Sequence, residues 1–293
     1  MSDQFGPPAP PLPLLYEKLI RRTLIEDLGR AGDLTTDAIV PPEAKAAATL
    51  VARAPGRIAG VQVALDVFRL LDPGIAAEIR IPDGADAGPA AEIGIFRGSA
   101  RALLTGERTA LNLLGRLSGI ATATRGIVAA VAPYSAKVVC TRKTTPGLRL
   151  LEKYAVRAGG GFNHRFGLDD AVLIKDNHRV VAGSVTEAVK RVRRHVGHTL
   201  KVEVEVDTLV QLEEALALGI DAVLLDNMSV DTLRQAVQMA RGRAVTEASG
   251  GITPTTAAAV ASTGVDLLSV GWLTHSAPAL DVALDFHPQH TAR

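Results

Sequence analysis

The C-terminal half of the sequence is a regular series of short apolar runs, and this regularity constrains the fold more than any other feature. Six strand candidates begin near Val138, Ala171, Val202, Ala222, Ala244 and Asp266. The gaps between them have room for one helix and two loops, so successive strands can run parallel. Helix-like stretches fall at 184–196, 209–218, 230–240 and 254–262. The series predicts either an α/β barrel short of eight strands or an open doubly wound sheet.

Two features favour the barrel. In the segment 201–207 the valines alternate with charged residues, so the valines can face outer helices while Glu203 and Glu205 face inward. The last two strands also end in small-residue loops, 249–251 and 269–271, where barrels often hold a phosphate. Thr253 and Pro254 suit the N-cap and first position of a helix, whose free N–H groups would face an anion; ordinary tight turns remain the alternative.

The stretch from Lys137 to Arg179 concentrates positive charge, with nine Lys or Arg against four acids, whereas the whole chain carries a net charge of +1. Arg149, Lys153 and Arg157 stand at helical spacing and are expected to form a solvated helix face with Glu152. Five other groups lie near strand ends or a Gly-rich turn, where the backbone can approach a ligand: Arg142, Lys143, His164, Arg165 and Lys175. They predict a pocket for a multiply charged anion.

Carboxylates are expected at the same strand ends, from Glu203, Glu205 and Asp226. Acids facing cations suggest that they hold a metal or another cation. A Mg²⁺ ion bound to substrate phosphates needs only one or two protein carboxylates, which Glu205 and Asp226 can supply.

The N-terminal half reads as a small sheet domain. It opens with an amphipathic helix over 14–28, continues through a turn-rich stretch, and has strand-like runs over 46–63 and 90–96. A helix of about thirty residues follows from Ala100. It carries Arg108, which is either functional or an ordinary surface arginine.

Composition excludes several classes. The aromatic content of 3% and the near-zero net charge argue against a nucleic-acid binder. The single cysteine, Cys140, cannot form an intrachain disulfide, which fits the cytoplasm, and is expected to be a buried strand residue. Neither a signal peptide nor a membrane-spanning run is apparent, and the Pro-rich residues 1–13 are expected to be a disordered tail.

Several segments carry a resemblance to a known family. They read GERTALNLLGRLSGIATAT, TRKTTPGLR, AGGGFNHRFGLDDAVLIKDNH, VEVEVD, AVLLDN, EASGGI and DLLSVGWLTHSAPALDVALDF, with EDLGRAGDLTT near the start. From about Tyr16 to Phe286 the sequence thereby resembles the nicotinate-nucleotide pyrophosphorylase (carboxylating) family, also called quinolinate phosphoribosyltransferase. The resemblance implies an N-terminal α/β sandwich domain over 14–115, joined by 278–293, and an incomplete six- to seven-stranded TIM-like α/β barrel over 116–277.

The same resemblance implies an activity, partners and residue roles. The reaction would join quinolinate and phosphoribosyl pyrophosphate into nicotinate mononucleotide, with loss of pyrophosphate and CO₂, in NAD biosynthesis. Mg²⁺ would assist, and Arg108 would reach the site of a neighbouring subunit in a homodimer. By similarity, the two quinolinate carboxylates would be held by Arg142, His164, Arg165 and Lys175, and Lys143 would lie near both substrates. Glu205 and Asp226 would position the ribose and Mg²⁺. The 5′-phosphate would be bound by the two loops that contain Ser249, Gly250 and Gly251, and Ser269, Val270 and Gly271. Lys143 and Lys175 are both candidates for returning a proton to the ring.

Three alternatives remain open at this point. One is a paralogous enzyme on the same fold with another acceptor. Two arginines and a lysine argue against an acceptor with a single carboxylate. Another is a Schiff-base aldolase using Lys143 or Lys175, which would leave Glu205 and Asp226 without a purpose. The third is a catalytically silent protein that binds anions.

Overall fold

The computed structural model describes residues 8–287, and the chain divides into two compact units. The first unit takes its residues from 1–125, 144–160 and 274–293, and the second from 126–143 and 161–273. Most of the predicted tail, residues 1–7 of 1–13, and the last six residues of the predicted return at 278–293 lie outside the described residues. Within residues 8–287, every helix is too short or too polar to cross a membrane.

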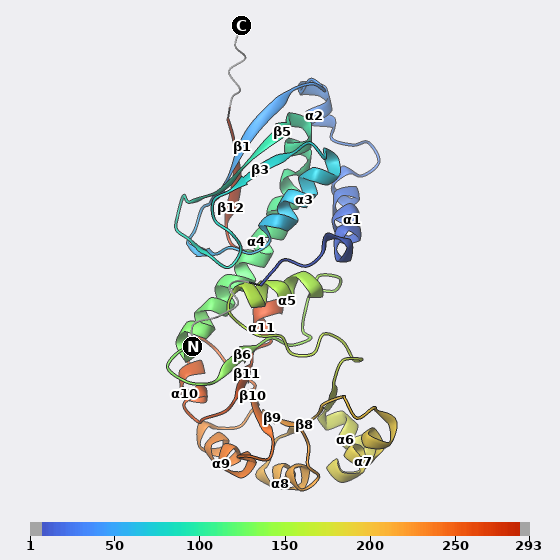
Figure 1. Cartoon of the computed structure of the whole chain (residues 1–293), viewed down its shortest axis with the longest axis vertical. Coiled ribbons are helices and arrows are strands. Elements are labelled where there is room, and N and C mark those ends of the chain that lie inside the picture. The colour runs from blue at the N-terminus through green and yellow to red at the C-terminus, as the bar shows by residue number, and fades with distance from the viewer. Residues whose placement is uncertain (1–7, 288–293) are drawn as a thin grey trace. The chain divides into compact units, whose positions relative to one another are not determined.

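The first unit contains a four-stranded antiparallel sheet in the order β12-β1-β5-β3 (Figure 1). Its strands are β1 (Lys45–Ala52), β3 (Ala76–Ile79), β5 (Glu92–Ser99) and β12 (Val282–His287). A two-stranded ribbon pairs β2 (Gly56–Arg57) with β4 (Asp86–Ala87). Inside the unit, the rings of Phe68 and Phe96 lie 5.3 Å apart and are almost completely buried, so a helix residue and a strand residue share one core.

The long helix from Ala100 is present as predicted, and the N-terminal helices need two corrections. Its elements are η1 (Pro13–Leu15), α1 (Glu17–Leu28), α2 (Leu34–Ile39), α3 (Val61–Leu71), α4 (Ala100–Val131) and α5 (Arg149–Ala158). The helix α4 has 32 residues and continues from the first unit into the second. The predicted helix over 14–28 is split, because its first turn is the separate helix η1. The turn-rich stretch after it contains α2, whose N-cap is Asp33.

The prediction of strand structure up to residue 63 is wrong, because α3 begins at Val61. Gly60 has a left-handed backbone conformation, with φ of 100°, which ends the extended run. The carboxylate of Asp83 then accepts hydrogen bonds from the N–H groups of Gly60, at 2.8 Å, and Val61, at 3.0 Å. This cap comes from a residue more than twenty positions away, so the alternating sequence VQVAL gives no local sign of it.

The second unit contains a six-stranded parallel sheet in the order β6-β11-β10-β9-β8-β7. The strands are β6 (Lys137–Val139), β7 (Val172–Ile174), β8 (Val202–Val206), β9 (Ala222–Asp226), β10 (Val245–Ser249) and β11 (Leu267–Ser269). Strands β7 to β11 pair with one another in chain order, and β6, the first strand, pairs with β11, the last. This order is that of a barrel opened between β6 and β7. A doubly wound sheet would instead reverse its strand order in the middle. A single bridge from Val139 to Phe162 extends the β6 edge. The unit is an incomplete α/β barrel, as predicted.

Helices lie along the outer side of this barrel (Figure 1). They are α6 (Asp176–Ala182), α7 (Val185–His195), α8 (Leu209–Ala217), α9 (Val230–Ala240) and α10 (Ala257–Ala261), and α11 (Trp272–His275) follows β11. The predicted start of α10 at Pro254 is wrong by three residues. The hydroxyl groups of Thr253 and Thr256 bond to backbone and to each other, so residues 254–256 form a turn that Thr256 ends.

The predicted solvated face of α5 is also wrong, because Glu152 and Lys153 are completely buried and Arg149 and Arg157 are half-buried. The carboxylate of Glu152 meets Arg116 of α4, whose Nη2 lies 2.8 Å from Oε1. The other oxygen of Glu152 accepts the N–H of Thr145 at 2.9 Å. The helical spacing of the charged residues predicted that they face solvent, but the first unit buries α5 on nearly all sides.

Arg116 also binds the returning C-terminal segment. Its guanidinium donates to the carbonyl of Ala277 at 3.1 Å and to that of Thr274. One turn further along α4, Gly119 leaves room for the backbone of this segment, because a Cβ atom there would lie 2.0 Å from the carbonyl oxygen of Pro278. One arginine therefore joins three stretches of chain that are far apart in sequence.

We expect Arg116→Met to lower the free energy of unfolding by about 3–5 kcal/mol, because the variant leaves the Glu152 carboxylate buried without its main counter-charge. Arg53→Met is the matched control: Arg53 pairs with Asp285 at the surface, where both side chains are nearly half exposed, and its loss is expected to cost under about 1 kcal/mol. Urea denaturation measures both, and equal costs for the two variants would contradict the expectation. Adding Glu152→Leu to Arg116→Met is expected to restore part of the loss.

Candidate active site

The strand register brings three predicted site residues to one level at the carboxyl ends of the strands. Asp226, the last residue of β9, pairs with Ser249, the last residue of β10. Ser249 in turn pairs with Ser269, the last residue of β11. Because side chains at alternate strand positions share a face, all three lie on the face that also carries Glu205 and Glu203.

The loops that follow these strands are tightly packed. Gly250 and Gly251 have φ of 96° and 60°, and a Cβ atom on Gly250 would lie 2.0 Å from Oδ1 of Asn227. Only glycine fits this position, so the loop keeps its backbone open to a ligand. After β11, the N–H of Val270 donates to the carbonyl of Val139 at 2.9 Å, which fixes the start of the loop 270–271 beside β6.

Cations and carboxylates meet at the β7 and β8 strand ends. Lys175 directly follows β7. Glu205 is the fourth residue of β8, the strand that pairs with β7. The Nζ atom of Lys175 lies 3.0 Å from Oε2 of Glu205, whose side chain is 12% exposed against 48% for the lysine. The predicted proximity of opposite charges at the barrel mouth is thus present.

Arg142 and Lys143 lie in the loop after β6, with Arg142 half-buried and Lys143 exposed. The N–H of Lys143 donates to the hydroxyl of Thr141 at 3.0 Å, which holds the turn. Cys140 is buried as predicted, but it follows β6 and is not part of the strand. Its Sγ lies 3.4 Å from Oδ1 of Asn163.

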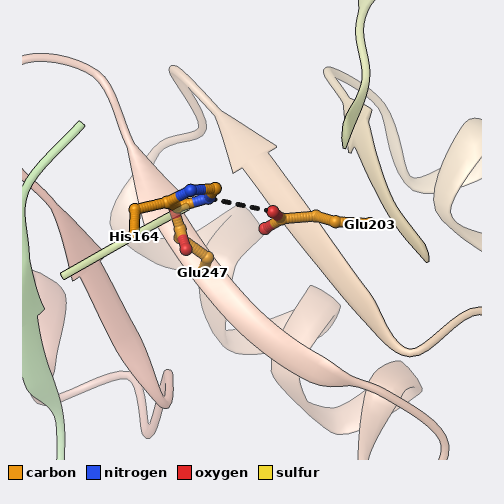
Figure 2. Close-up of side chains that lie close together, drawn as sticks. All are labelled: His164, Glu203 and Glu247. Carbon is orange, nitrogen blue, oxygen red and sulfur yellow. Dashed lines mark hydrogen bonds and ion pairs between the residues drawn. The ribbon is translucent and has the colours of Figure 1, made fainter. Parts of the chain in front are cut away.

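His164 and Arg165 reach the same region from beside β6. The bridge at Phe162 places the chain there, with hydrogen bonds of 2.8 Å to the carbonyl of Val138 and 3.2 Å from the N–H of Cys140. Figure 2 shows the ring of His164 directed at the carboxylate of Glu203, with Glu247 close by. The Nε2 atom lies 3.0 Å from Oε2 of Glu203 and 3.7 Å from Oε1 of Glu247.

Burial and neighbouring charges shift two pKa values in this cluster. Burial and the positive charge of Arg142 lower the pKa of Arg165, while Asp170 and Glu203 oppose that shift. Burial and the negative charge of Glu203 raise the pKa of Glu247 to about 7, against the opposing effects of His164, a hydrogen bond with Ser269 and Lys175. The cluster thus holds two arginines, Arg142 and Arg165, near each other, and two glutamates, Glu203 and Glu247, near each other.

Sequence reasoning did not select Glu247. Its signal was present: in VTEAS the residue stands two positions before Ser249, so it shares the inward face. Its almost complete burial, with 1% of its surface exposed, becomes visible only when β9 and β11 flank it.

Arg108 is the one predicted site residue that belongs to the first unit, where it is exposed on α4. Burial raises the pKa of the adjacent Glu107, and the charge of Arg108 opposes this shift. All other predicted site residues belong to the second unit.

Glu205 and Asp226 fit the donor set that Mg²⁺ requires. They lie on neighbouring strands and on one face, with Asp226 two residues beyond the partner of Glu205. Each carboxylate uses one oxygen in a hydrogen bond, to Lys175 and to Asn227, and two carboxylates with substrate phosphates suffice for this ion.

Comparisons with known proteins agree with this architecture. Two family models match, described as quinolinate phosphoribosyl transferase, N-terminal domain, over residues 33–118, and C-terminal domain, over 120–285. The chain is 48% identical over 273 residues to the nicotinate-nucleotide pyrophosphorylase [carboxylating] of Mycobacterium leprae, covering 91% of this chain and 95% of that protein. It is 46% identical over 272 residues to the probable enzyme of that name from Bacillus subtilis, covering 93% of each.

A solved structure shares the fold over nearly the whole length. The NadC crystal structure from Streptococcus pyogenes superposes with a TM-score of 0.91 at 40% identity, covering 96% of this chain and all of that one. Family models that together span both units, relatives above 40% identity and a shared fold lead to one conclusion: the chain belongs to the quinolinate phosphoribosyltransferase family.

Proposed function

We propose that this protein transfers the phosphoribosyl group of phosphoribosyl pyrophosphate to quinolinate, with release of pyrophosphate and CO₂, to give nicotinate mononucleotide for NAD biosynthesis. The relatives that carry this activity in their names support the proposal. The observation that carries it is the gathering of four cations, at Arg142, Lys143, Arg165 and Lys175, around strand ends that bear carboxylates. The reaction would take place in the cytoplasm, where the thiol of Cys140 stays reduced.

The cations match a dicarboxylate. The guanidinium groups of Arg142 and Arg165 can each hold a carboxylate by two parallel hydrogen bonds. Burial, and then the charge of Arg142, lower the pKa of Arg165, and an anion bound between the two groups would offset both effects. A mono-acid would satisfy only part of this charge. Quinolinate, with two adjacent carboxylates, is therefore the acceptor that the set favours.

The opposite side of the strand ends suits the phosphoribosyl donor. Gly250 and Gly251 are exposed and have positive φ, so their backbone can approach a 5′-phosphate, and Glu205 and Asp226 can bind ribose hydroxyl groups. When bound by Glu205 and Asp226, Mg²⁺ would neutralise charge on the leaving pyrophosphate. Lys143, exposed in the loop after β6, can approach the same phosphates.

The chemistry follows from these positions. As the bond from the ribose to pyrophosphate breaks, positive charge develops on the sugar, and the carboxylates of Glu205 and Asp226 stabilise it. The ring nitrogen of quinolinate then bonds to the sugar carbon and becomes cationic. The adjacent carboxylate leaves as CO₂, and its electron pair stays on the ring carbon, where the ring cation stabilises it. That carbon finally takes a proton, for which Lys143 and Lys175 are the candidates.

We expect the purified protein to form nicotinate mononucleotide and pyrophosphate from quinolinate, phosphoribosyl pyrophosphate and Mg²⁺. Nicotinate in place of quinolinate is the control and is expected to give at least 100-fold slower turnover, because it leaves a cationic subsite unpaired. Chromatography of the nucleotide and a pyrophosphate assay measure both. Quinolinate binding without turnover would instead identify a silent binder, and equal turnover of both acids would identify a different acceptor preference.

Glu205 and Asp226 provide a second test. We expect Asp226→Ala and Glu205→Ala to lower kcat by about 100-fold or more, because each removes a charge that stabilises the transition state and helps hold Mg²⁺. Calorimetry with quinolinate alone is expected to show affinity close to that of the unchanged protein. Asp285→Ala, on the surface of the first unit, is the control for loss of a carboxylate. Loss of quinolinate binding in these variants would instead reverse the assignment.

We also propose a homodimer in which Arg108 completes the site of the neighbouring subunit. Arg108→Ala and Lys143→Ala are then each expected to be nearly inactive alone. Mixed by unfolding and refolding in equal amounts, they are expected to recover about one quarter of full activity, because half of the dimers are mixed and each mixed dimer has one intact site. Full activity of Arg108→Ala, or an active monomer by light scattering, would contradict this arrangement.

A further inference from the structure

We propose that His178 is a positioning residue, whose ring nitrogen Nδ1 holds the backbone of Lys175 and so directs this lysine at the strand ends. The proposal deepens the proposed function and rests on it for the identity of the anion, quinolinate, that Lys175 helps to bind. The choice of histidine is part of the proposal, because its ring offers a hydrogen-bond acceptor without adding a negative charge beside the lysine.

Lys175 lies at the junction of a strand and a helix. It is the single residue between β7, which ends at Ile174, and α6, which begins at Asp176. Its N–H donates to Nδ1 of His178 at 2.9 Å, and its carbonyl accepts the N–H of Arg179 at 3.1 Å. Both backbone polar groups of Lys175 are therefore bonded to residues of α6.

His178 takes a place in the helix that a glutamate or glutamine usually takes. It is the third residue of α6 and accepts the N–H of the N-cap residue, which is one half of a capping box. Because a backbone N–H can only donate, Nδ1 must offer a lone pair and carries no proton in this bond. A glutamate would make the same bond and would suit the positive end of the helix dipole, but it would bring a negative charge close to Lys175. Histidine thus provides the cap and leaves the charge of the lysine available for an anion.

Polar contacts at its first residues hold α6 in place. The whole of α6 lies within the described residues, and none of its seven residues is buried. Val180 and Val181 are 80% and 84% exposed. The Nη2 atom of Arg179 lies 2.7 Å from Oδ1 of Asp207, the residue after β8, and this pair ties the helix to the end of that strand. The bond from Lys175 to His178 transmits the position of the helix to the backbone of the lysine.

The side chain of Lys175 benefits from a fixed backbone. It is 48% exposed, and its Nζ atom lies 3.0 Å from Oε2 of Glu205. A long, half-exposed lysine has many rotamers, and a backbone that cannot turn reduces the number of positions that Nζ can reach. Less ordering entropy is then lost when the ammonium group binds a carboxylate. Removal of the His178 bond is therefore expected to weaken substrate binding, although no group that touches the substrate is removed.

A matched pair of substitutions separates the cap from the charge. His178→Gln and His178→Glu have the same shape, and both side chains can accept the N–H of Lys175. We expect Gln to bind quinolinate within about two-fold of the unchanged protein, and Glu about five-fold more weakly, with a loss that shrinks at high salt. Stability in urea is expected to follow the other order, with Glu at least as stable as Gln, because a carboxylate favours a helix N-terminus. Equal affinity of the two variants, or a loss in Gln as large as in Glu, would overturn the proposal.

His178→Leu removes the acceptor and tests the route through Lys175. We expect quinolinate affinity to fall about five-fold, because one hydrogen bond of this kind is lost. His195→Leu, at the exposed end of α7, is the control and is expected to leave the affinity unchanged. In the background Lys175→Met, the leucine substitution is expected to cost less than about two-fold, because the residue through which His178 acts has been removed. A five-fold loss that persists in this background would show that the ring acts on the substrate by another route, and the proposal would be wrong. If Lys175→Met binds too weakly for the measurement, the Gln and Glu pair still decides.

Hydrogen exchange of the Lys175 amide, followed by NMR of the full chain, tests the cap without any substrate. We expect slow exchange in the unchanged protein and in His178→Gln, and exchange about ten-fold faster in His178→Leu, because the amide then loses its acceptor. Equal exchange rates in all three would overturn the proposal. Failure of the unchanged protein to bind quinolinate would defeat the proposed function, while the exchange rates would still decide whether His178 holds Lys175.

Discussion

Alternation along β8 is the constraint on which the second unit depends. Because successive side chains of a strand point to opposite faces, the valines of VEVEV can only pack outward if the glutamates point inward. An interior that contains Glu203 and Glu205, and Glu247 from β10, must then contain positive charge or strong hydrogen-bond donors. His164 and Lys175 provide them at 3.0 Å each. The inward acids thus make cations or strong donors a structural requirement, and one of these cations, Lys175, belongs to the proposed substrate pocket.

The first unit also contains a buried acid that needs a counter-charge. Glu152 is completely buried, and its charge is balanced by Arg116, whose remaining donors bind carbonyl groups of the returning chain. Such a pair contributes less to stability than to uniqueness, because other arrangements of the three segments would leave a charge buried alone. The contacts of Arg116 thereby favour one arrangement of α4, α5 and the returning segment.

Much of this architecture was visible in the sequence, for identifiable reasons. All six parallel strands begin within one residue of their predicted positions, because they are short runs of apolar or alternating apolar and polar residues between clear turn signals. The failures share another cause. The cap of α3 by Asp83, the burial of Lys153 and the pairing of Glu247 with Glu203 and His164 all depend on residues distant in sequence, and no local pattern reports such contacts. The sequence therefore predicted the site residues at the strand ends, whereas it did not predict Glu247, which lies two residues before the end of β10.

The pairing of β1 with β12 has a consequence for the making of this protein. Ala47 lies opposite His287 and Ala52 opposite Val282, so one edge of the first sheet is closed by nearly the last described residues of the chain. During synthesis, the early strands must wait, with the edge of β1 unpaired, while the whole second unit emerges from the ribosome. An unpaired strand edge is a site of aggregation. In the second unit β7 to β11 pair in chain order and β6 pairs with β11, so all six strands are available before β12 has been made.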